Sequence, residues 1–76
     1  MLILKTKNKM KFKVDGPYIE LIQLLKAVGL ASTGGHAKMI VNEEMVYRND
    51  EIELRKRAKL IPGDVIKVYD QVIELE

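Results

Sequence analysis

The chain has 76 residues and a net charge of +2, and it contains no cysteine. This length allows one domain, because a second core would need roughly 50 residues of its own, and the missing cysteines exclude disulfides and Cys-based zinc sites. No apolar run is long enough for a signal peptide or for a membrane span of about 18 residues, so we expect a cytoplasmic protein without a membrane partner.

The first predicted element is an N-terminal β-hairpin within residues 1–16. Residues 2–5 and 11–14 are rich in strand formers, and the polar Lys7, Asn8 and Lys9 between them suit a turn. Such a hairpin would divide the five lysines of this segment between its turn and its strands. We therefore expect these lysines to matter less for binding than the cations later in the chain.

Two helices are predicted next, near residues 18–28 and 33–43. The first would be capped by Asp15, with Pro17 in its first turn, and would end at Gly29. Ser32 and Thr33 carry hydroxyls that can cap the second. With their tight connection the two form a helix-turn-helix. The apolar stripes expected to be buried are Tyr18, Leu21, Ile22, Leu25 and Val28 in the first helix and Ala37, Ile40 and Val41 in the second.

After residue 42 the apolar pattern changes to a period of two. Residues 46–48 and 52–54 flank an Asn49-Asp50 turn, residues 65–68 follow a Pro-Gly-Asp turn, and residues 72–75 form a last strand. The predicted fold class is therefore α+β, with the helix-turn-helix packed on a small, mainly antiparallel sheet.

The start of the second helix is a candidate anion site. Gly34 and Gly35 would leave open backbone amides there, and Lys38 lies one turn on, within reach of a phosphate. The alternative is that the two glycines only let the helices approach closely.

A second candidate site is the run that contains Arg55, Lys56, Arg57 and Lys59. Four cations within five positions suit a polyanion, although a solvated loop is the alternative. The few aromatic residues argue against a stacking platform, and Tyr47 beside Arg48 is the one expected to face a ligand. Tyr18 is expected in the core and Phe12 in the packing of the sheet.

Catalytic residues, a metal site and a cofactor are not expected. His36 is the only histidine, so it has no partner for a zinc pair, and it is expected on the surface of the first helical turn. The predicted protein is a binding module and not an enzyme.

Three ordered motifs resemble a known family: residues 19–32, the helix start at residues 33–38, and the segment 53–68 with its basic run and Pro-Gly-Asp turn. Together they are similar to the S-four RNA-binding domain, named after a small-subunit ribosomal protein, and most of all to its short bacterial stand-alone members. The similarity covers about residues 17–75 of a single domain that spans residues 1–76. The family's contact positions fall on Ser32, Thr33, Lys38, Arg48, Arg55, Lys56, Arg57 and Lys59.

The resemblance implies binding of structured RNA, either ribosomal or transfer RNA, in ribosome assembly or translation, with the ribosome or its precursors as a further partner and the chain acting as a monomer. The sequence departs from the family at Gly34, where many members have Arg, and at Glu44 and Asp50, where Gly is usual. Glu44 would carry strain in a left-handed site.

Other functional classes have their own sequence requirements. A protein-interaction adaptor would use the acidic edge formed by Glu43, Glu44, Glu51 and Glu53. A DNA-binding helix-turn-helix would need a more polar second helix, and a ubiquitin-like sulfur carrier would end in Gly-Gly.

Overall fold

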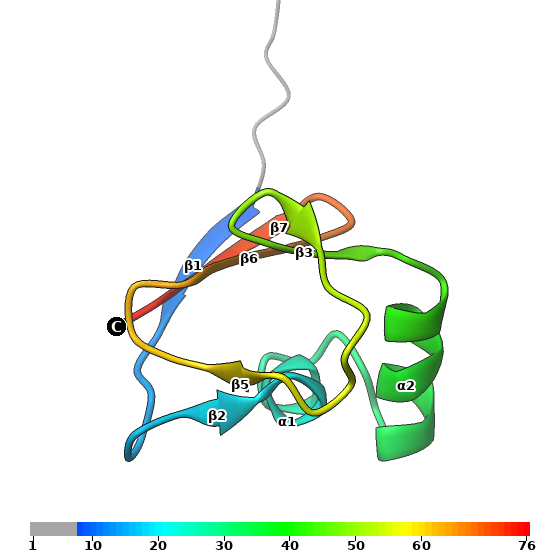
Figure 1. Ribbon diagram of the computed structural model, residues 1–76, viewed down its shortest axis with the longest axis horizontal. Coiled ribbons are helices and arrows are strands. Elements are labelled where there is room, and N and C mark those ends of the chain that lie inside the picture. The colour runs from blue at the N-terminus through cyan, green and yellow to red at the C-terminus, as the bar shows by residue number, and fades with distance from the viewer. Residues whose placement is uncertain (1–7) are drawn as a thin grey trace, which may run out of the picture.

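Two helices and seven strands form residues 8–76, the part of the chain that the computed structural model describes (Figure 1). Five strands form one sheet in the order β1-β7-β6-β3-β4, and β2 and β5 form a second, two-stranded sheet. Every pairing is antiparallel except that of β1 with β7. The strands are β1 (Asn8–Phe12), β2 (Ile19–Glu20), β3 (Val46–Arg48), β4 (Glu51–Ile52), β5 (Lys59–Leu60), β6 (Val65–Val68) and β7 (Gln71–Leu75), and the helices are α1 (Leu21–Ala27) and α2 (Gly34–Asn42).

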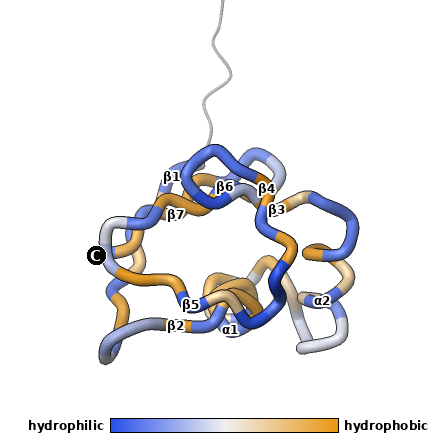
Figure 2. Tube along the Cα trace, viewed as in Figure 1, coloured by the Kyte–Doolittle hydropathy of each residue, from blue (hydrophilic) through white to orange (hydrophobic). Residues whose placement is uncertain are grey.

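The hydrophobic core lies between the five-stranded sheet on one side and the helices with the small sheet on the other (Figure 1). Figure 2 shows that β6, β7 and α1 carry long hydrophobic stretches. Full burial of one Leu or Ile side chain contributes about 1.5–3 kcal/mol, so these side chains dominate the stability of so small a domain. The largest buried side chains are Leu21, Leu24, Leu25, Ile40, Leu60, Ile66 and Ile73. The predicted α+β class, with two helices on a mostly antiparallel sheet, is confirmed.

The N-terminal segment differs from its prediction. Asn8 and Lys9 lie in β1 and not in a turn, and β1 pairs in parallel with β7 at the other end of the chain. The predicted hairpin turn is therefore wrong, and the first predicted arm, residues 2–5, lies outside the described residues. Met10 and Phe12 pack against the core, as strand residues two apart must do when one face is buried. The burial gained against β7 outweighs the local turn tendency.

Helix α1 begins three residues later than the periodicity predicts. Glu20 occupies the N-cap position without a capping side-chain hydrogen bond, and Ile19 pairs with Leu60 of β5. The amides of Leu21 and Ile22 donate instead to backbone carbonyls of residues 58 and 56, at 3.0 and 3.2 Å. A distant loop therefore satisfies the helix start, so Asp15 is not the cap. The helix ends as predicted, with Gly29 at a positive φ of 83°.

The later elements follow their predictions closely. Strands β3, β6 and β7 occupy the expected segments, and β4 is shorter than predicted. Asn49 and Asp50 form the turn between β3 and β4 with φ of 51° and 73°, the left-handed values of a two-residue hairpin. Glu44 also has a positive φ, 62°, as expected. Strand β5 was not predicted, because two residues leave no periodicity to detect.

Neither of the two helices within residues 8–76 is long and apolar enough to cross a membrane.

Candidate functional site

The start of α2 presents open backbone amides, as predicted. Thr33 is the N-cap, and its hydroxyl accepts a hydrogen bond from the amide of His36 at 3.0 Å. The Nδ1 atom of His36 in turn accepts from the amide of Ser32 at 3.3 Å, so the imidazole belongs to the cap and lies half-buried at the surface. The amides of Gly34 and Gly35 have no acceptor among the described residues. These two N–H groups, at the positive end of the helix dipole, are suited to an anion.

The glycines are not needed for helix packing. A Cβ atom added to Gly34 would meet nothing within 4 Å, and one added to Gly35 would meet only the Thr33 hydroxyl at 3.9 Å. The alternative explanation, that the glycines let the two helices approach closely, is therefore wrong. Because Gly34 and Gly35 have no side chains, they leave the backbone amides of the α2 start accessible from solvent.

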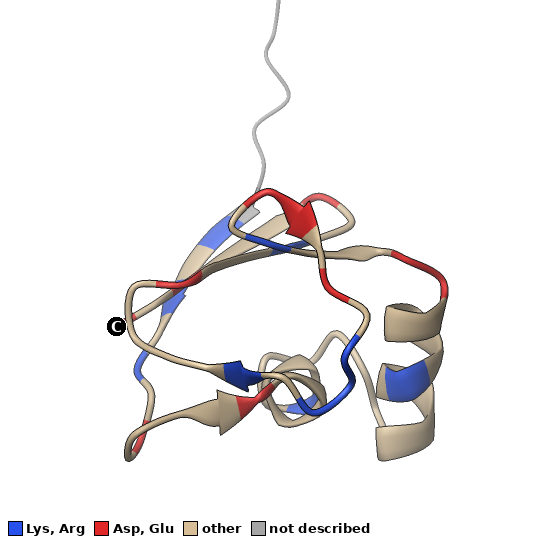
Figure 3. Cartoon of the chain, in the orientation of Figure 1, with Lys and Arg blue, Asp and Glu red and all other residues tan. Residues whose placement is uncertain are grey.

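The basic loop, defined here as residues 53–58 between β4 and β5, is held against the start of α1. Its carbonyls at residues 56 and 58 accept the hydrogen bonds from the first helical amides. The side chains of Arg55 and Arg57 are 72% and 76% exposed, so the loop backbone is fixed while its guanidinium groups reach solvent. Figure 3 shows the cations of this loop on the same side of the molecule as the lysine of α2.

A buried carboxylate, Glu53, organises Arg55. It accepts hydrogen bonds from the Arg55 backbone amide at 3.0 Å and from its Nε and Nη2 atoms at 2.9 and 3.1 Å. The hydrogen bond from the Arg55 side chain lowers the pKa of Glu53 and outweighs burial, which raises it. Glu53 therefore stays ionised and holds one edge of the guanidinium, and the rest of that group remains exposed.

The side chain of Arg48 forms hydrogen bonds and ion pairs inside the fold. Its Nε and Nη2 atoms bind Asp64 at 3.2 and 2.9 Å, Nη2 also donates to the carbonyl of Lys59 at 3.0 Å, and Nη1 lies 3.6 Å from Glu53. Burial raises the pKa of Asp64, but hydrogen bonds from the Ile61 amide, from Asn49 and from Arg48 outweigh it, so this pKa is lowered. Arg48 thus joins the two sheets, and only 22% of its side chain is exposed to solvent.

Two further cations have acidic or aromatic neighbours. Arg57 pairs with Glu20 at 3.2 Å on the surface, where such pairs contribute at most about 1 kcal/mol. The ammonium of Lys59 lies 5.1 Å from the ring centre of Tyr18. Tyr18 is 39% exposed and lies outside α1, so its predicted place in the core is wrong. It precedes the helix because α1 starts later than expected.

Four of these cations line one hollow. Its wall is formed by Arg48, Arg55, Arg57, Ala58 and Lys59, and its volume is about 360 Å³. The structure thus brings together most of the predicted basic residues around a concave surface, while Lys56 is half-buried beside it. Lys38 and the α2 start do not line this hollow. Tyr47 is 40% exposed on β3 and lines a different one with Tyr69.

The predicted acidic edge is smaller than the sequence indicates. Glu43, Glu44 and Glu51 are exposed, but Glu53 is buried and bound to Arg55. Within residues 8–76, no three His, Cys, Asp or Glu side chains gather where they could hold a metal ion.

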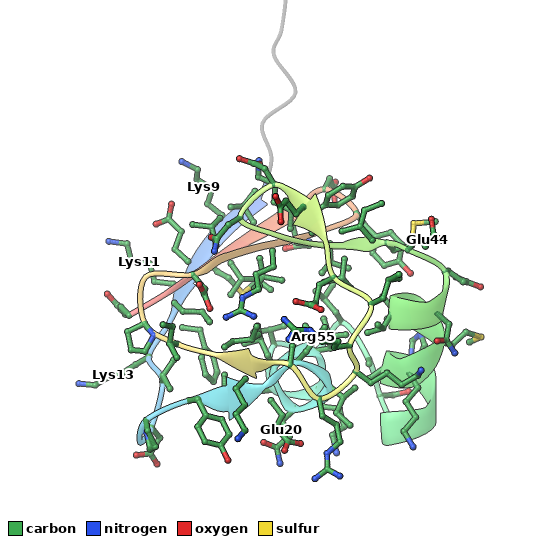
Figure 4. The ribbon with its side chains drawn as sticks, viewed as in Figure 1. Lys9, Lys11, Lys13, Glu20, Glu44 and Arg55 are labelled. Carbon is green, nitrogen blue, oxygen red and sulfur yellow. The ribbon has the colours of Figure 1, made fainter. Side chains whose placement is uncertain are left out.

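Three lysines of the N-terminal segment, expected to matter less for binding than the later cations, form an ordered basic feature. Lys9, Lys11 and Lys13 are all exposed and alternate with residues that pack inward, so they share one face of the sheet edge (Figure 4). Their i, i+2, i+4 spacing indicates side chains on one face of a strand. The predicted turn at Asn8 divided the lysines between a turn and two strands, so this shared face was not predicted.

Comparisons with known proteins agree with this fold. The family model described as the S4 domain matches residues 12–76. The protein YbcJ of Escherichia coli (strain K12) is 36% identical over 59 residues, which cover 78% of this chain and 84% of YbcJ. RlbA of Bacillus subtilis (strain 168), whose name gives it a probable role in ribosome maturation, is 38% identical over 55 residues, covering 72% of this chain and 78% of RlbA.

A solved structure is also similar. The solution structure of E. coli YbcJ, described as revealing an ALFAL motif involved in RNA-binding, has a TM-score of 0.69 and 28% sequence identity. The alignment covers 99% of this chain and 96% of that one.

Proposed function

The chain belongs to the S4 domain family, and from this premise we propose that it is a non-catalytic module that binds structured RNA, either ribosomal or transfer RNA, in ribosome assembly or translation. The observation that carries the proposal is the hollow lined by Arg48, Arg55, Arg57 and Lys59. Concave surfaces lined by guanidinium groups suit phosphates, because the planar fork of Arg donates two parallel hydrogen bonds. The RNA-binding motif described for YbcJ and the ribosome maturation role in the name of RlbA support it.

The parts of the surface have different expected roles. Arg55 and Arg57 present their free guanidinium edges to phosphates, and Lys38 with the open amides of α2 offers a second anion contact. Arg48 and Glu53 mainly hold the basic loop in place. Because phosphate contacts carry no sequence information, this surface recognises the shape of folded RNA more than its sequence.

The test is the salt dependence of binding to purified ribosomal RNA and transfer RNA. Each phosphate contact adds about one unit to the slope of log affinity against log salt, so Arg55→Ala with Arg57→Ala should flatten the slope by about two. Circular dichroism should show that the double variant remains folded. Loss of Arg57 removes only a surface ion pair, whereas loss of Arg55 leaves the buried carboxylate of Glu53 with Arg48 as its remaining cation and should lower the free energy of unfolding by about 1–3 kcal/mol.

A matched control uses Lys26, an exposed cation at the end of α1 and outside the proposed surface. Lys26→Ala should leave the slope nearly unchanged. Wild-type protein without salt-sensitive affinity for either RNA would contradict the proposal and would favour the protein-interaction adaptor. If the protein does bind RNA, crosslinking in cells followed by sequencing of the attached RNA would identify the target.

A further inference from the structure

The exposed edge of the five-stranded sheet carries an ordered set of cations, here called the lysine row: Lys9, Lys11 and Lys13. Strand β1 is the outermost strand of the sheet, and its only described partner is β7. Met10 and Phe12 pack against the core, and Val14 is buried, so the three lysines that alternate with these residues project to the opposite face. Figure 4 shows all three pointing away from the body of the molecule on one side.

The strand geometry gives the row a regular spacing. Residues two apart on a β-strand are separated by about 6.7 Å, so the Cα atoms from which the three lysine side chains project follow one line at nearly equal intervals. The line extends past the end of β1, because the Val14 amide donates to the carbonyl of Glu76 at 2.8 Å and keeps the backbone extended. Neighbouring phosphates along one RNA strand have a comparable separation, so the row matches a phosphate backbone in both charge and spacing.

The acids that face the row come from the neighbouring strand. Glu74 lies opposite Lys11 in the register of β1 with β7, and Glu76 lies next to Lys13. Neither acid forms an ion pair with the row, and no other acid of residues 8–76 does so. Residues 1–7 contain two further lysines and no acid. Glu74 is half-buried one strand inward, whereas the lysines form the outer edge.

The row is separate from the hollow lined by the basic loop. Strands β1 and β4 are the two opposite edges of the sheet, and the basic loop follows β4. Figure 3 shows the cations of β1 on one side of the molecule and those of the basic loop and α2 toward the other. Because the two surfaces lie at opposite edges of the sheet, an RNA segment bound in the hollow leaves the row free to contact a different segment.

We propose that the lysine row is a second RNA-contacting surface, which binds the phosphate backbone of a segment adjacent to the one held by the basic loop. This proposal rests on the proposed RNA-binding function. The contribution is electrostatic and independent of sequence, since ammonium groups on flexible stems act as point charges. It would let a small domain hold a folded RNA from two sides.

The test compares salt slopes for binding to ribosomal RNA. A triple variant, with Gln in place of Lys9, Lys11 and Lys13, should reduce the slope by about two to three units. Because it also lowers the net charge, a second form of it carries Glu43→Gln, Glu44→Gln and Glu51→Gln, three exposed acids that lie after α2 and on β4, away from β1 and β7. The slope should stay low in this charge-restored form. Recovery of the wild-type slope would show an effect of net charge alone and would overturn the proposal.

A gain-of-function variant gives an independent readout. Glu74→Gln removes the acid opposite Lys11, and it should strengthen RNA binding about two- to fivefold in the wild-type background, in line with the energy of an exposed charge pair. The same change should have no effect in the triple variant. An equal effect in both backgrounds would contradict a role of the row.

Other outcomes separate this proposal from the proposed function. If wild-type protein shows no salt-sensitive RNA binding, the proposed function fails first. If wild type binds but the triple variant keeps its slope and instead self-associates, the lysines only protect a free sheet edge, and the proposal is overturned. It is also overturned if the variant loses binding only to vesicles of phosphatidylserine and phosphatidylcholine. Should the triple variant unfold, Lys11→Gln alone should lower the slope by about one.

Discussion

Glu44 holds a backbone conformation that side chains other than glycine rarely adopt. Its φ is 62°, directly after α2, and its amide donates to the carbonyl of Val41 at 3.0 Å to close the helix. The left-handed conformation costs a residue with a Cβ atom about 1–2 kcal/mol, and Gly is the residue usually found at this place in a helix C-terminus. The strain expected from the sequence is therefore present.

We predict that Glu44→Gly stabilises the protein by about 0.5–1.5 kcal/mol, because glycine removes the left-handed penalty and loses part of that gain through the entropy of the unfolded chain. The matched control is Glu43→Gly, since the neighbouring residue is also exposed but has a φ of −85°. That change should be destabilising. Thermal and urea unfolding of both variants measure the difference, and a loss of stability in Glu44→Gly would contradict the strain argument.

At the level of elements, the start of α2 was predictable because its signals are local. Thr33 caps the helix through a residue three positions away, and the apolar stripe of Ala37, Ile40 and Val41 is buried as expected. The start of α1 and the pairing of β1 depend on contacts across most of the chain, with residues 56–58 and with β7. The local sequence pattern does not indicate these distant partners. The predictions of Asp15 as the helix cap and of an N-terminal turn were therefore wrong.

The same limit applies to the candidate site. The sequence shows where the cations are, but it does not show which carboxylates they bind. Arg48 is directed inward by Asp64, and Arg55 is held by Glu53. Sequence spacing gives no distance between Arg48 and Asp64, which are 16 positions apart, so the division of the basic residues into exposed and structural ones required the fold.

Helix α2 provides a prediction about the cap. Thr33→Ala removes the acceptor of the His36 amide and should lower the free energy of unfolding by about 1 kcal/mol. Ser32→Ala is the control, because the described contact of Ser32 uses its backbone amide and not its hydroxyl. Chemical denaturation measures both. Equal losses in the two variants would show that the hydroxyl of Thr33 is not the cap.

At the scale of the whole molecule, one ionic network connects the two sheets. Arg48 on β3 of the large sheet binds Asp64 before β6 and the carbonyl of Lys59 on β5 of the small sheet, and it lies beside Glu53. Asp64 also accepts hydrogen bonds from Asn49 and from the Ile61 amide. Among the described residues, none of the buried side-chain nitrogen and oxygen atoms lacks a hydrogen-bond partner.

This network makes the whole fold sensitive to acid. The pKa values of Glu53 and Asp64 are both lowered in the folded protein, so the unfolded state binds more protons. Their contribution to stability is complete above their ordinary pKa values of 4.5 and 3.8, and it is lost as the pH falls through the lower, folded-state values. We therefore predict that the free energy of unfolding begins to fall below about pH 5 and continues to fall below pH 3.8.

The variant Asp64→Asn tests whether the acid sensitivity comes from this network and not from the overall charge of the protein. It should be less stable than wild type by about 1–3 kcal/mol at pH 7, because Arg48 loses its carboxylate and keeps part of its charge inside the fold. Between pH 5 and pH 3 its stability should change less than that of wild type, since one of the two titrating groups is gone. Asp70→Asn, at an exposed acid in the turn between β6 and β7, should follow the wild-type curve. Urea unfolding at a series of pH values measures all three proteins, and parallel curves for wild type and Asp64→Asn would show that Asp64 does not couple the fold to pH.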